Sequence, residues 1–271
     1  MSTQSKVLGN IHVMGNVTVG ETNPRIKPVV YLPMTAGSGT VEDKSAAGNG
    51  LDGTLVNATW TTGTTKTGGN AVLFDGYGDA IDLGTDAKLT PTTAFSISVW
   101  AYCTDFESDY TSLFRRWDTG GGHEKQAYAL LTGESGEGNG KLTLFIMKDS
   151  PTGTGDYSRL RTDSAVLSLN QWHHIVATYS GAEGRMRIYV DNVLKDATLS
   201  GQSVPSSINV ASAMRAALGR NYGTGGGAHH SWSGVLDEFS LWDIELDSTQ
   251  VSYLYGNGTP NSAELGLYPT V

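Results

Sequence analysis

At 271 residues, the chain is long enough for one domain with a sizeable hydrophobic core. It has 35 glycines and only 17% charged residues, a composition that suits many strands joined by tight turns and excludes a helical bundle. The formal net charge of −9 argues against a nucleic-acid partner held through its phosphates. Because Cys103 is the only cysteine, no disulfide can form within the chain.

The first 28 residues differ from the rest of the chain. Gly9-Asn10 and Gly15-Asn16 lie six residues apart, and each pair is followed by alternating apolar residues. A repeat of this kind predicts either an extended arm that pairs with a neighbouring chain or a flexible tail. Two prolines, Pro24 and Pro28, mark the boundary to a domain that we expect over residues 29–256, with a tail over 257–271.

Long apolar segments are missing from the sequence. The N-terminus has no run long enough for a signal-peptide core, and no stretch approaches the roughly 18 apolar residues of a membrane helix. We therefore expect neither ordinary secretion nor membrane insertion. Cys103 lies in an apolar strand, which predicts a buried and inert thiol.

A polar, glycine-rich loop spans residues 42–53. It combines carboxylates with the amide of Asn49, and such oxygens are the donors that a hard cation prefers. The alternative is an Asx-turn, in which Asp43 only holds the loop in shape. Asp75 and Asp79, separated by glycines, are interpreted as a hairpin turn rather than as a second metal site.

Alternating apolar residues separated by turn signals predict an all-β domain of two antiparallel sheets packed as a sandwich. The expected strands cover residues 29–34, 71–76, 79–83, 95–103, 111–117, 127–132, 141–147, 158–163, 171–180, 185–192, 216–220 and 231–243. The segment 247–255 is expected to be helical, with Asp247 or Ser248 as its cap. In the strand 95–103 the odd-numbered residues should face the core, while Trp100 and Tyr102 lie on the other face.

Four segments carry a resemblance to a known family. The hairpin that begins at Trp172 and ends at Asn192 resembles the hairpin of laminin-G-like, concanavalin-A-like jelly-roll domains. Residues 71–83 and 95–103 resemble early strands of that family, and residues 234–255 resemble its closing strand and tail. The resemblance implies an antiparallel β-sandwich of the jelly-roll type with a short N-terminal arm. This fold hosts lectins, adhesion modules, spacers and glycanases.

The resemblance also implies one structural calcium ion. In the family the ion lies between the polar loop and an aspartate of the closing strand, which corresponds here to Asp43, Asn49 and Asp237. Ala46-Ala47 departs from the family's loop pattern. The Asx-turn remains the alternative.

The sequence does not favour an enzyme. Glycanases of this fold place two carboxylates on one strand face, in a Glu-x-Asp-x-x-Glu pattern that this chain lacks. Asp237 and Glu238 are neighbours in an expected strand, so we expect them to face opposite ways. His173 and His174 are also neighbours, and no third ligand at zinc-like spacing follows, which favours structural roles.

A glycan site would need an aromatic platform beside planar polar groups. The candidate side chains lie in or beside loops, and each aromatic has core packing as its alternative. They are Trp117, His123, Tyr157, Arg159, Tyr222, His230 and Trp232.

Taken together, these features predict a non-enzymatic binding or assembly module. A missing signal peptide, a missing disulfide and a repeat-like arm favour a structural or display protein of a phage or virus particle, exposed on the virion surface. In that hypothesis the arm joins copies of the chain, or joins it to a capsid or tail protein, and the jelly roll binds surface glycans. The alternative is a freestanding extracellular carbohydrate-binding or adhesion module.

Overall fold

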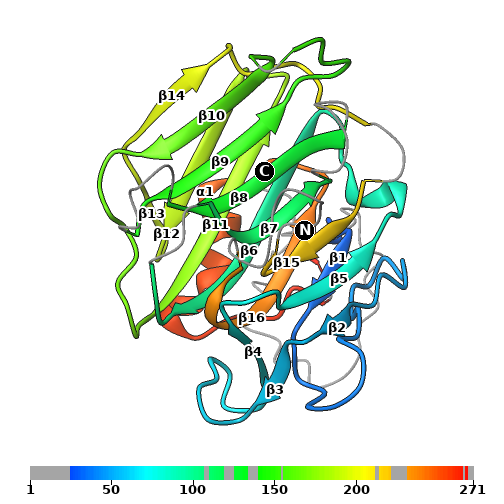
Figure 1. The fold of residues 1–271 in the computed structure, drawn as a ribbon, viewed down its shortest axis with the longest axis vertical. Helices are drawn as coiled ribbons and strands as arrows, with labels where there is room; N and C mark the ends of the chain where they lie inside the picture. The colour runs from blue at the N-terminus through cyan, green and yellow to red at the C-terminus, as the bar shows by residue number, and fades with distance from the viewer. Residues whose placement is uncertain are drawn as a thin grey trace, which may run out of the picture.

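The computed structural model describes residues 25–106, 110–118, 125–133, 140–153, 155–210, 214–220, 231–264 and 266–267. Two antiparallel sheets lie face to face in this part of the chain, as the sequence predicts (Figure 1). No helix within these ranges is long and apolar enough to cross a membrane.

The front sheet faces the viewer in Figure 1 and has the strand order β14-β10-β9-β8-β7-β15-β5-β2. Its strands are β2 (Thr54–Val56), β5 (Ala80–Gly84), β7 (Thr111–Trp117), β8 (Gln126–Thr132), β9 (Leu142–Met147), β10 (Tyr157–Thr162), β14 (Ala197–Gly201) and β15 (Ala216–Leu218).

The back sheet lies behind it, with the order β13-β12-β11-β6-β16-β4-β3, and β1 pairs with β16. Its strands are β1 (Val30–Leu32), β3 (Thr59–Thr61), β4 (Ala71–Asp75), β6 (Ala94–Cys103), β11 (Trp172–Ser180), β12 (Arg185–Val190), β13 (Val193–Leu194) and β16 (Ser233–Trp242). The helix α1 (Ser248–Tyr255) and two short 3-10 segments, Ala87–Leu89 and Gly256–Gly258, complete the described elements.

The core between the sheets follows the predicted alternation. In β6, Phe95, Ile97 and Val99 belong to the buried core, while Trp100 faces outward, which confirms the expected faces. Aromatic rings join the two sheets: the centroids of Phe95 and Tyr128 lie 4.5 Å apart. Cys103 is 3% exposed, and burial raises the pKa of its thiol to about 12, in agreement with an inert cysteine.

Strand β16 contains a clear departure from the predicted alternation. Leu236 and Phe239 both belong to the core although they are three residues apart, because a bulge interrupts the register after Asp237. At the bulge, Glu238 has a positive φ of 52°, and β16 changes its neighbour from β4 to β1. The expectation that Asp237 and Glu238 face opposite ways is wrong, since the bulge leaves both outside the core.

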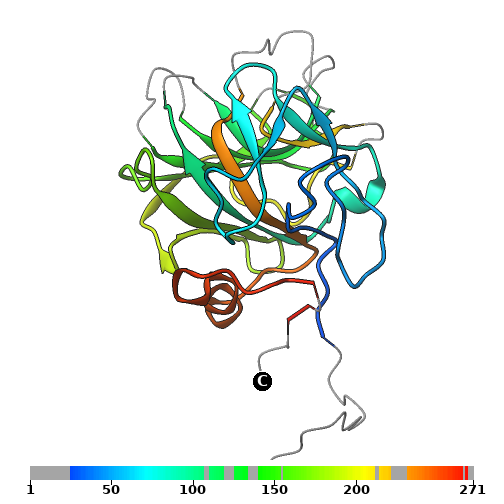
Figure 2. The same ribbon diagram turned by 90° about the horizontal axis from the view of Figure 1, so that it is seen from below.

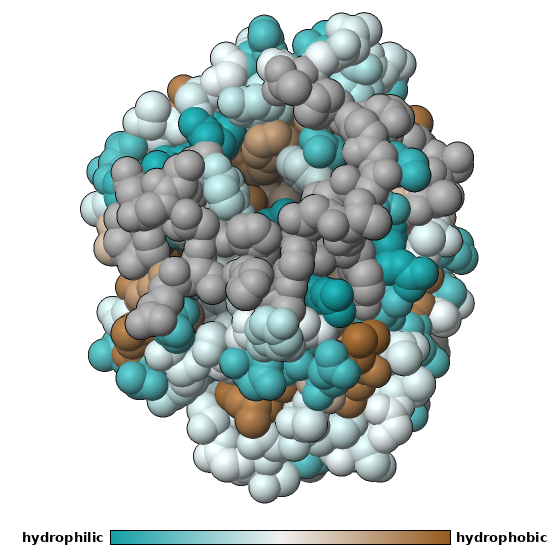
Figure 3. All heavy atoms as spheres, in the orientation of Figure 1, coloured by the Kyte–Doolittle hydropathy of each residue, from teal (hydrophilic) through white to brown (hydrophobic). Residues whose placement is uncertain are grey.

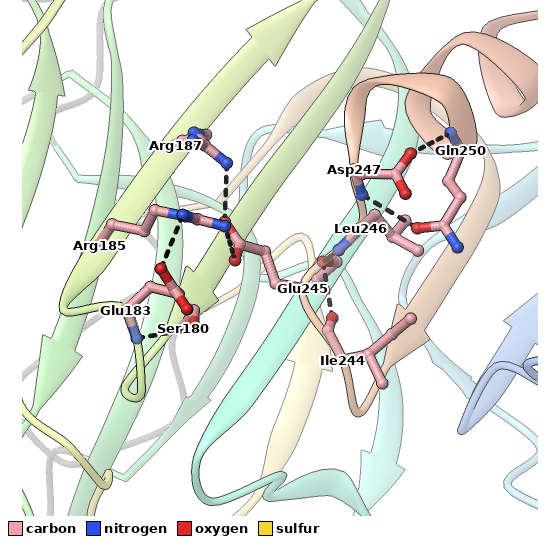
Figure 4. A network of polar contacts seen from close by, with 10 residues as sticks. Ser180, Glu183, Arg185, Arg187, Ile244, Glu245, Leu246, Asp247 and Gln250 are labelled. Atoms are coloured by element: carbon pink, nitrogen blue, oxygen red, sulfur yellow. Dashed lines mark hydrogen bonds and ion pairs between the residues drawn. The ribbon is translucent and has the colours of Figure 1, made fainter. Parts of the chain in front are cut away.

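Helix α1 covers the outer face of the back sheet (Figure 2). Asp247 forms a capping box with Gln250 at the start of the helix, and Val251 and Leu254 pack on a second apolar cluster that includes Trp242. Just before the helix, Glu245 pairs with two arginines of β12 (Figure 4). The cap and the ion pairs fix the helix over this face.

The two ends of the described chain meet on the same side as α1. Ile26 and Leu267 form an antiparallel bridge with N–H to O distances of 2.7 Å in both directions. Both residues pack against the cluster beneath α1, which places the ends away from the front sheet (Figure 2).

Candidate functional site

The outer face of the front sheet carries a row of side chains that the strand register brings together. Arg115 of β7 lies opposite Ala129 of β8, which lies opposite Phe145 of β9, which lies opposite Arg159 of β10. On its other side, Arg115 lies opposite Ala217 of β15. Because alanine projects only one carbon from the sheet, the two alanines keep the surface low on both sides of Arg115.

A cleft of about 280 Å³ lies over this row. In the space-filling view, a hollow with hydrophobic side chains at its floor is visible in the upper half of the same face (Figure 3). The lining residues are Tyr110, Arg115, Trp117, Gln126, Leu131, Gly133, Thr143, Phe145, Met147, Tyr157 and Arg159. This described lining contains two arginines and no acidic residue, although the chain has a net charge of −9.

Three aromatic rings form a continuous row along the cleft. The ring centroids of Trp117 and Phe145 are 4.8 Å apart, and those of Phe145 and Tyr157 are 4.7 Å apart with nearly parallel planes. All three side chains are partly exposed. Partly exposed, neighbouring ring faces can stack against the flat apolar face of a ligand.

Arg115 is the most deeply buried charged residue of the cleft, with 5% of its surface exposed. Among the described residues its guanidinium makes one hydrogen bond, from Nη2 to the carbonyl of Tyr110, and Nε has no partner. The guanidinium carbon lies 5.9 Å from the ring centre of Trp117. Burial lowers the pKa of Arg115 to about 9, so the group stays charged at neutral pH.

Further polar atoms around the cleft lack partners within the described ranges. They are Nε1 of Trp117 and Oγ1 of Thr143. Arg159 differs, because its Nε donates to Oγ of Ser200 at 3.0 Å, and its guanidinium carbon lies 6.0 Å from the ring centre of Tyr157. The cleft thus offers aromatic faces at its centre and a cation at each end.

Three of the predicted glycan-binding residues lie in the same cleft, and a fourth lies in the core. Trp117, Tyr157 and Arg159 line the same cleft. Trp232 is fully buried in the core, so its ring has no face for a sugar, and its predicted role is wrong.

The other three predicted glycan residues cannot be placed relative to the cleft. His123, Tyr222 and His230 lie outside the described residues.

Sequence reasoning missed Phe145 and Arg115. Alternation places each on an outer face, but only the pairing of β7, β8 and β9 brings them beside Trp117 and Tyr157. The local pattern of one strand does not predict which residues of another strand, distant in sequence, lie opposite it.

The residues predicted to hold calcium make hydrogen bonds within the chain. Asp43 accepts backbone hydrogen bonds from Tyr31, Ser45 and Leu51, at 2.9 to 3.0 Å. Asn49 donates its side-chain amide to the carbonyl of Val29 at 2.7 Å.

The third predicted ligand, Asp237, is fully buried and accepts from the backbone N–H groups of Lys66 and Glu238. No group of three or more His, Cys, Asp or Glu side chains in the described ranges is arranged to hold a metal. The contacts of Asp43 with Ser45 are those of an Asx-turn, and a calcium ion held by Asp43, Asn49 and Asp237 stays a prediction.

A second polar cluster lies on the back sheet, beneath α1. Oε2 of Glu238 accepts a 2.6 Å hydrogen bond from the hydroxyl of Tyr31, and Nε2 of His174 lies 2.9 Å from Oγ of Ser98. Burial raises the pKa values of Asp237 and Glu238, and the charge of Glu238 raises that of Asp237 further. The cavity lined by Tyr31, Ser98, His174 and Glu238 measures only about 10 Å³, which is room for one water molecule and not for a sugar ring.

Both predicted structural histidines hold the chain together. Nδ1 of His173 lies 2.7 Å from Oδ2 of Asp191, and its Nε2 accepts from the N–H of Ser168. His174 packs against the rings of Trp100 and Tyr255. Burial lowers the pKa of His174 to about 3, so this imidazole is neutral at physiological pH.

Comparison with known proteins agrees with the architecture. Residues 75–252 match the family model of the concanavalin A-like lectin/glucanases superfamily. C-reactive protein 1.1 of Limulus polyphemus is 30% identical over 91 residues, which are 32% of this chain and 37% of that protein. The sushi, von Willebrand factor type A, EGF and pentraxin domain-containing protein 1 of Rattus norvegicus is 34% identical over 86 residues, or 31% of this chain and 2% of that protein.

Two solved structures share the fold over most of the chain. Domain 4 of AbnA, an extracellular arabinanase of Geobacillus stearothermophilus, in complex with arabinotriose, superposes with a TM-score of 0.59 and 19% identity. That match covers 84% of this chain and 98% of the domain. The binding domain of Paraclostridial Mosquitocidal Protein 1 gives a TM-score of 0.60 and 16% identity, covering 84% of this chain and 52% of that one.

Proposed function

The chain belongs to the concanavalin A-like lectin/glucanases superfamily, and we propose that it is a non-catalytic module that binds carbohydrate in the cleft of the front sheet. The observation that carries this proposal is the row of Trp117, Phe145 and Tyr157 between two arginines. A sugar ring has an apolar face, which stacks on aromatic rings, and a rim of hydroxyls, which need hydrogen-bond partners.

The similar proteins support this proposal at the level of the fold. The arabinanase domain was solved with a sugar, and the mosquitocidal fragment is described as a binding domain. These identities are low, so the cleft residues of this chain, rather than those of its relatives, carry the argument.

Two arrangements favour binding over glycoside hydrolysis. Hydrolysis of this kind uses a pair of carboxyl groups flanking the bond to be cleaved, and the described lining of the cleft has none. On the back sheet, Glu238 lies beside a cavity too small for a sugar, and the neighbouring Asp237 is fully buried.

A glycan array with matched variants tests the binding proposal. We expect Trp117→Ala and Tyr157→Ala to weaken binding of any recognised glycan roughly tenfold or more, because each removes a stacking face. Tyr253→Ala is the control, since Tyr253 is 49% exposed on α1, far from the cleft. The proposal fails if the unaltered chain binds no glycan, or if the cleft variants bind as the control does.

The display role on a virus or phage particle, with the freestanding extracellular module as its alternative, rests on the N-terminal repeat. Residues 1–24 of the chain, which include this repeat, lie outside the described ranges. One arrangement favours the display role: the chain ends lie on the α1 side, so an anchor there would leave the cleft facing outward.

Light scattering tests the arm directly. If residues 1–28 join copies of the chain, the full-length protein should form an oligomer, and a chain lacking these residues should be a folded monomer. An unchanged mass after the deletion would remove the arm from the proposal.

A further inference from the structure

We propose that the cleft selects acidic sugars, with an anionic group of the sugar paired to Arg115. This inference rests on the proposed function and adds the charge of the ligand to it. It begins from the surroundings of Arg115, which is 5% exposed and retains unused hydrogen-bonding capacity.

A buried guanidinium needs an acidic partner or several hydrogen-bond acceptors, because removing a charge from water is unfavourable unless other groups replace the lost hydration. Arg115 has only the carbonyl of Tyr110 as a hydrogen-bond acceptor among the described residues, and no carboxylate is paired with it there. Other arginines of the described sandwich have more acceptors: Arg185 and Arg187 share Glu245, and the buried Arg116 donates to a threonine hydroxyl and two backbone carbonyls.

The cross-strand neighbours of Arg115 are small. Ala129 and Ala217 occupy the positions on both sides, so no long side chain reaches the guanidinium from there. Trp117, two residues along the same strand, lies beside the guanidinium and also contacts Phe145. An anionic sugar could therefore stack on the aromatic row while its acidic group meets Arg115.

The charge distribution of the cleft points the same way. Both charged residues of its described lining are arginines, in a protein whose net charge is −9. Arg159 lies three strands from Arg115, about 14 Å at the usual strand spacing of about 4.8 Å.

The test compares sugars that differ only in their acidic group. The probes are a uronic-acid trisaccharide, the same trisaccharide with its carboxyl groups reduced to hydroxymethyl groups, and a sulfated form of the reduced sugar. Calorimetric titration of the full chain should give at least about tenfold tighter binding for one of the charged forms than for the neutral form, as expected for a charge-assisted hydrogen bond. The charged form that binds more tightly identifies the anion.

Variants then assign the preference to Arg115. We expect Arg115→Met to bind charged and neutral probes within about twofold of each other, since methionine keeps much of the volume without the charge. The control Arg187→Met, on the back sheet, should keep the full preference. Should Arg115→Met fail to fold, the comparison of the three probes on the unaltered chain still decides whether the cleft selects acidic sugars.

The outcomes separate the two proposals. Equal affinity for charged and neutral sugars, or a preference that survives in Arg115→Met, would overturn the acidic-sugar inference and leave carbohydrate binding intact. An absence of binding to every sugar on the array and to all three probes would overturn both.

Discussion

The two outer faces of the sandwich carry similar kinds of side chain but differ in how far these side chains are covered by other parts of the chain. On the back sheet, Trp100, His174 and Glu238 lie beneath α1 and the segment that follows it, around a cavity of about 10 Å³. On the front sheet, Trp117 and Arg115 line a cleft of about 280 Å³. Aromatic and ionisable residues on an outward strand face therefore do not make a binding site by themselves. Where a helix covers them, residues of the same types form a second buried cluster.

The largest expected difference between the faces is in stability. Trp242 is fully buried under α1, and Trp242→Ala should lower the free energy of unfolding by about 3–5 kcal/mol through lost burial and a cavity. Trp117→Ala should cost only about 1 kcal/mol, since that ring is partly exposed, while removing glycan binding. Urea denaturation of the two variants measures the contrast, and equal losses would mean that the cleft is as much a core as the back face is.

A smaller effect should appear in the pH dependence of stability. Burial raises the pKa of Glu238 to about 7, so the folded state holds this proton more tightly than the unfolded state does. Stability from this group is then full below the ordinary pKa of a glutamate and is lost as the pH rises from about 4 to about 7.

Glu238→Gln removes that contribution, together with the part of the raised Asp237 pKa that comes from the charge of Glu238. Glutamine keeps an oxygen that can accept from Tyr31 and cannot ionise, so we expect its stability to decline less between pH 4 and 7. Glu42→Gln, an exposed change on the polar loop, is the control and should follow the unaltered chain. Thermal unfolding across this range measures the slopes, and parallel curves for Glu238→Gln and the unaltered chain would contradict the assignment.

The smallest effect is expected from calcium. Because the oxygens of Asp43 and Asp237 accept backbone hydrogen bonds, we expect addition of calcium, or of a chelator, to leave Tm unchanged. An ion at a hundred times its Kd would add about 2.7 kcal/mol, which scanning calorimetry detects easily. A Tm that rises with calcium and loses this response in Asp237→Ala would instead support the predicted site.

Much of the fold could be predicted because its strands are long and alternate clearly. The predicted segment 111–117 coincides with β7, and the predicted helix 247–255 begins one residue before α1. The missed strands β2, β3, β13 and β14 are short, and each lies at or near a sheet edge, where partly exposed residues weaken the apolar pattern.

The site could be predicted only in part, for a different reason. Trp117, Tyr157 and Arg159 carry a local signal, an aromatic or planar cation at a strand end, but the same signal at Trp232 marks a core residue. Which of these side chains meet depends on the strand register, and the bulge at Glu238 depends on the change of partner from β4 to β1. Both are set by pairing between distant segments, which a single sequence does not state.

The pairing of Ile26 with Leu267 has a mechanical consequence. A force applied to the two ends would first act on this antiparallel pair and on its packing beneath α1, before it reached the long strands of either sheet. The aromatic row lies on the opposite sheet, outside that line of tension. A module tethered through these ends could therefore bear a load while its cleft keeps its shape.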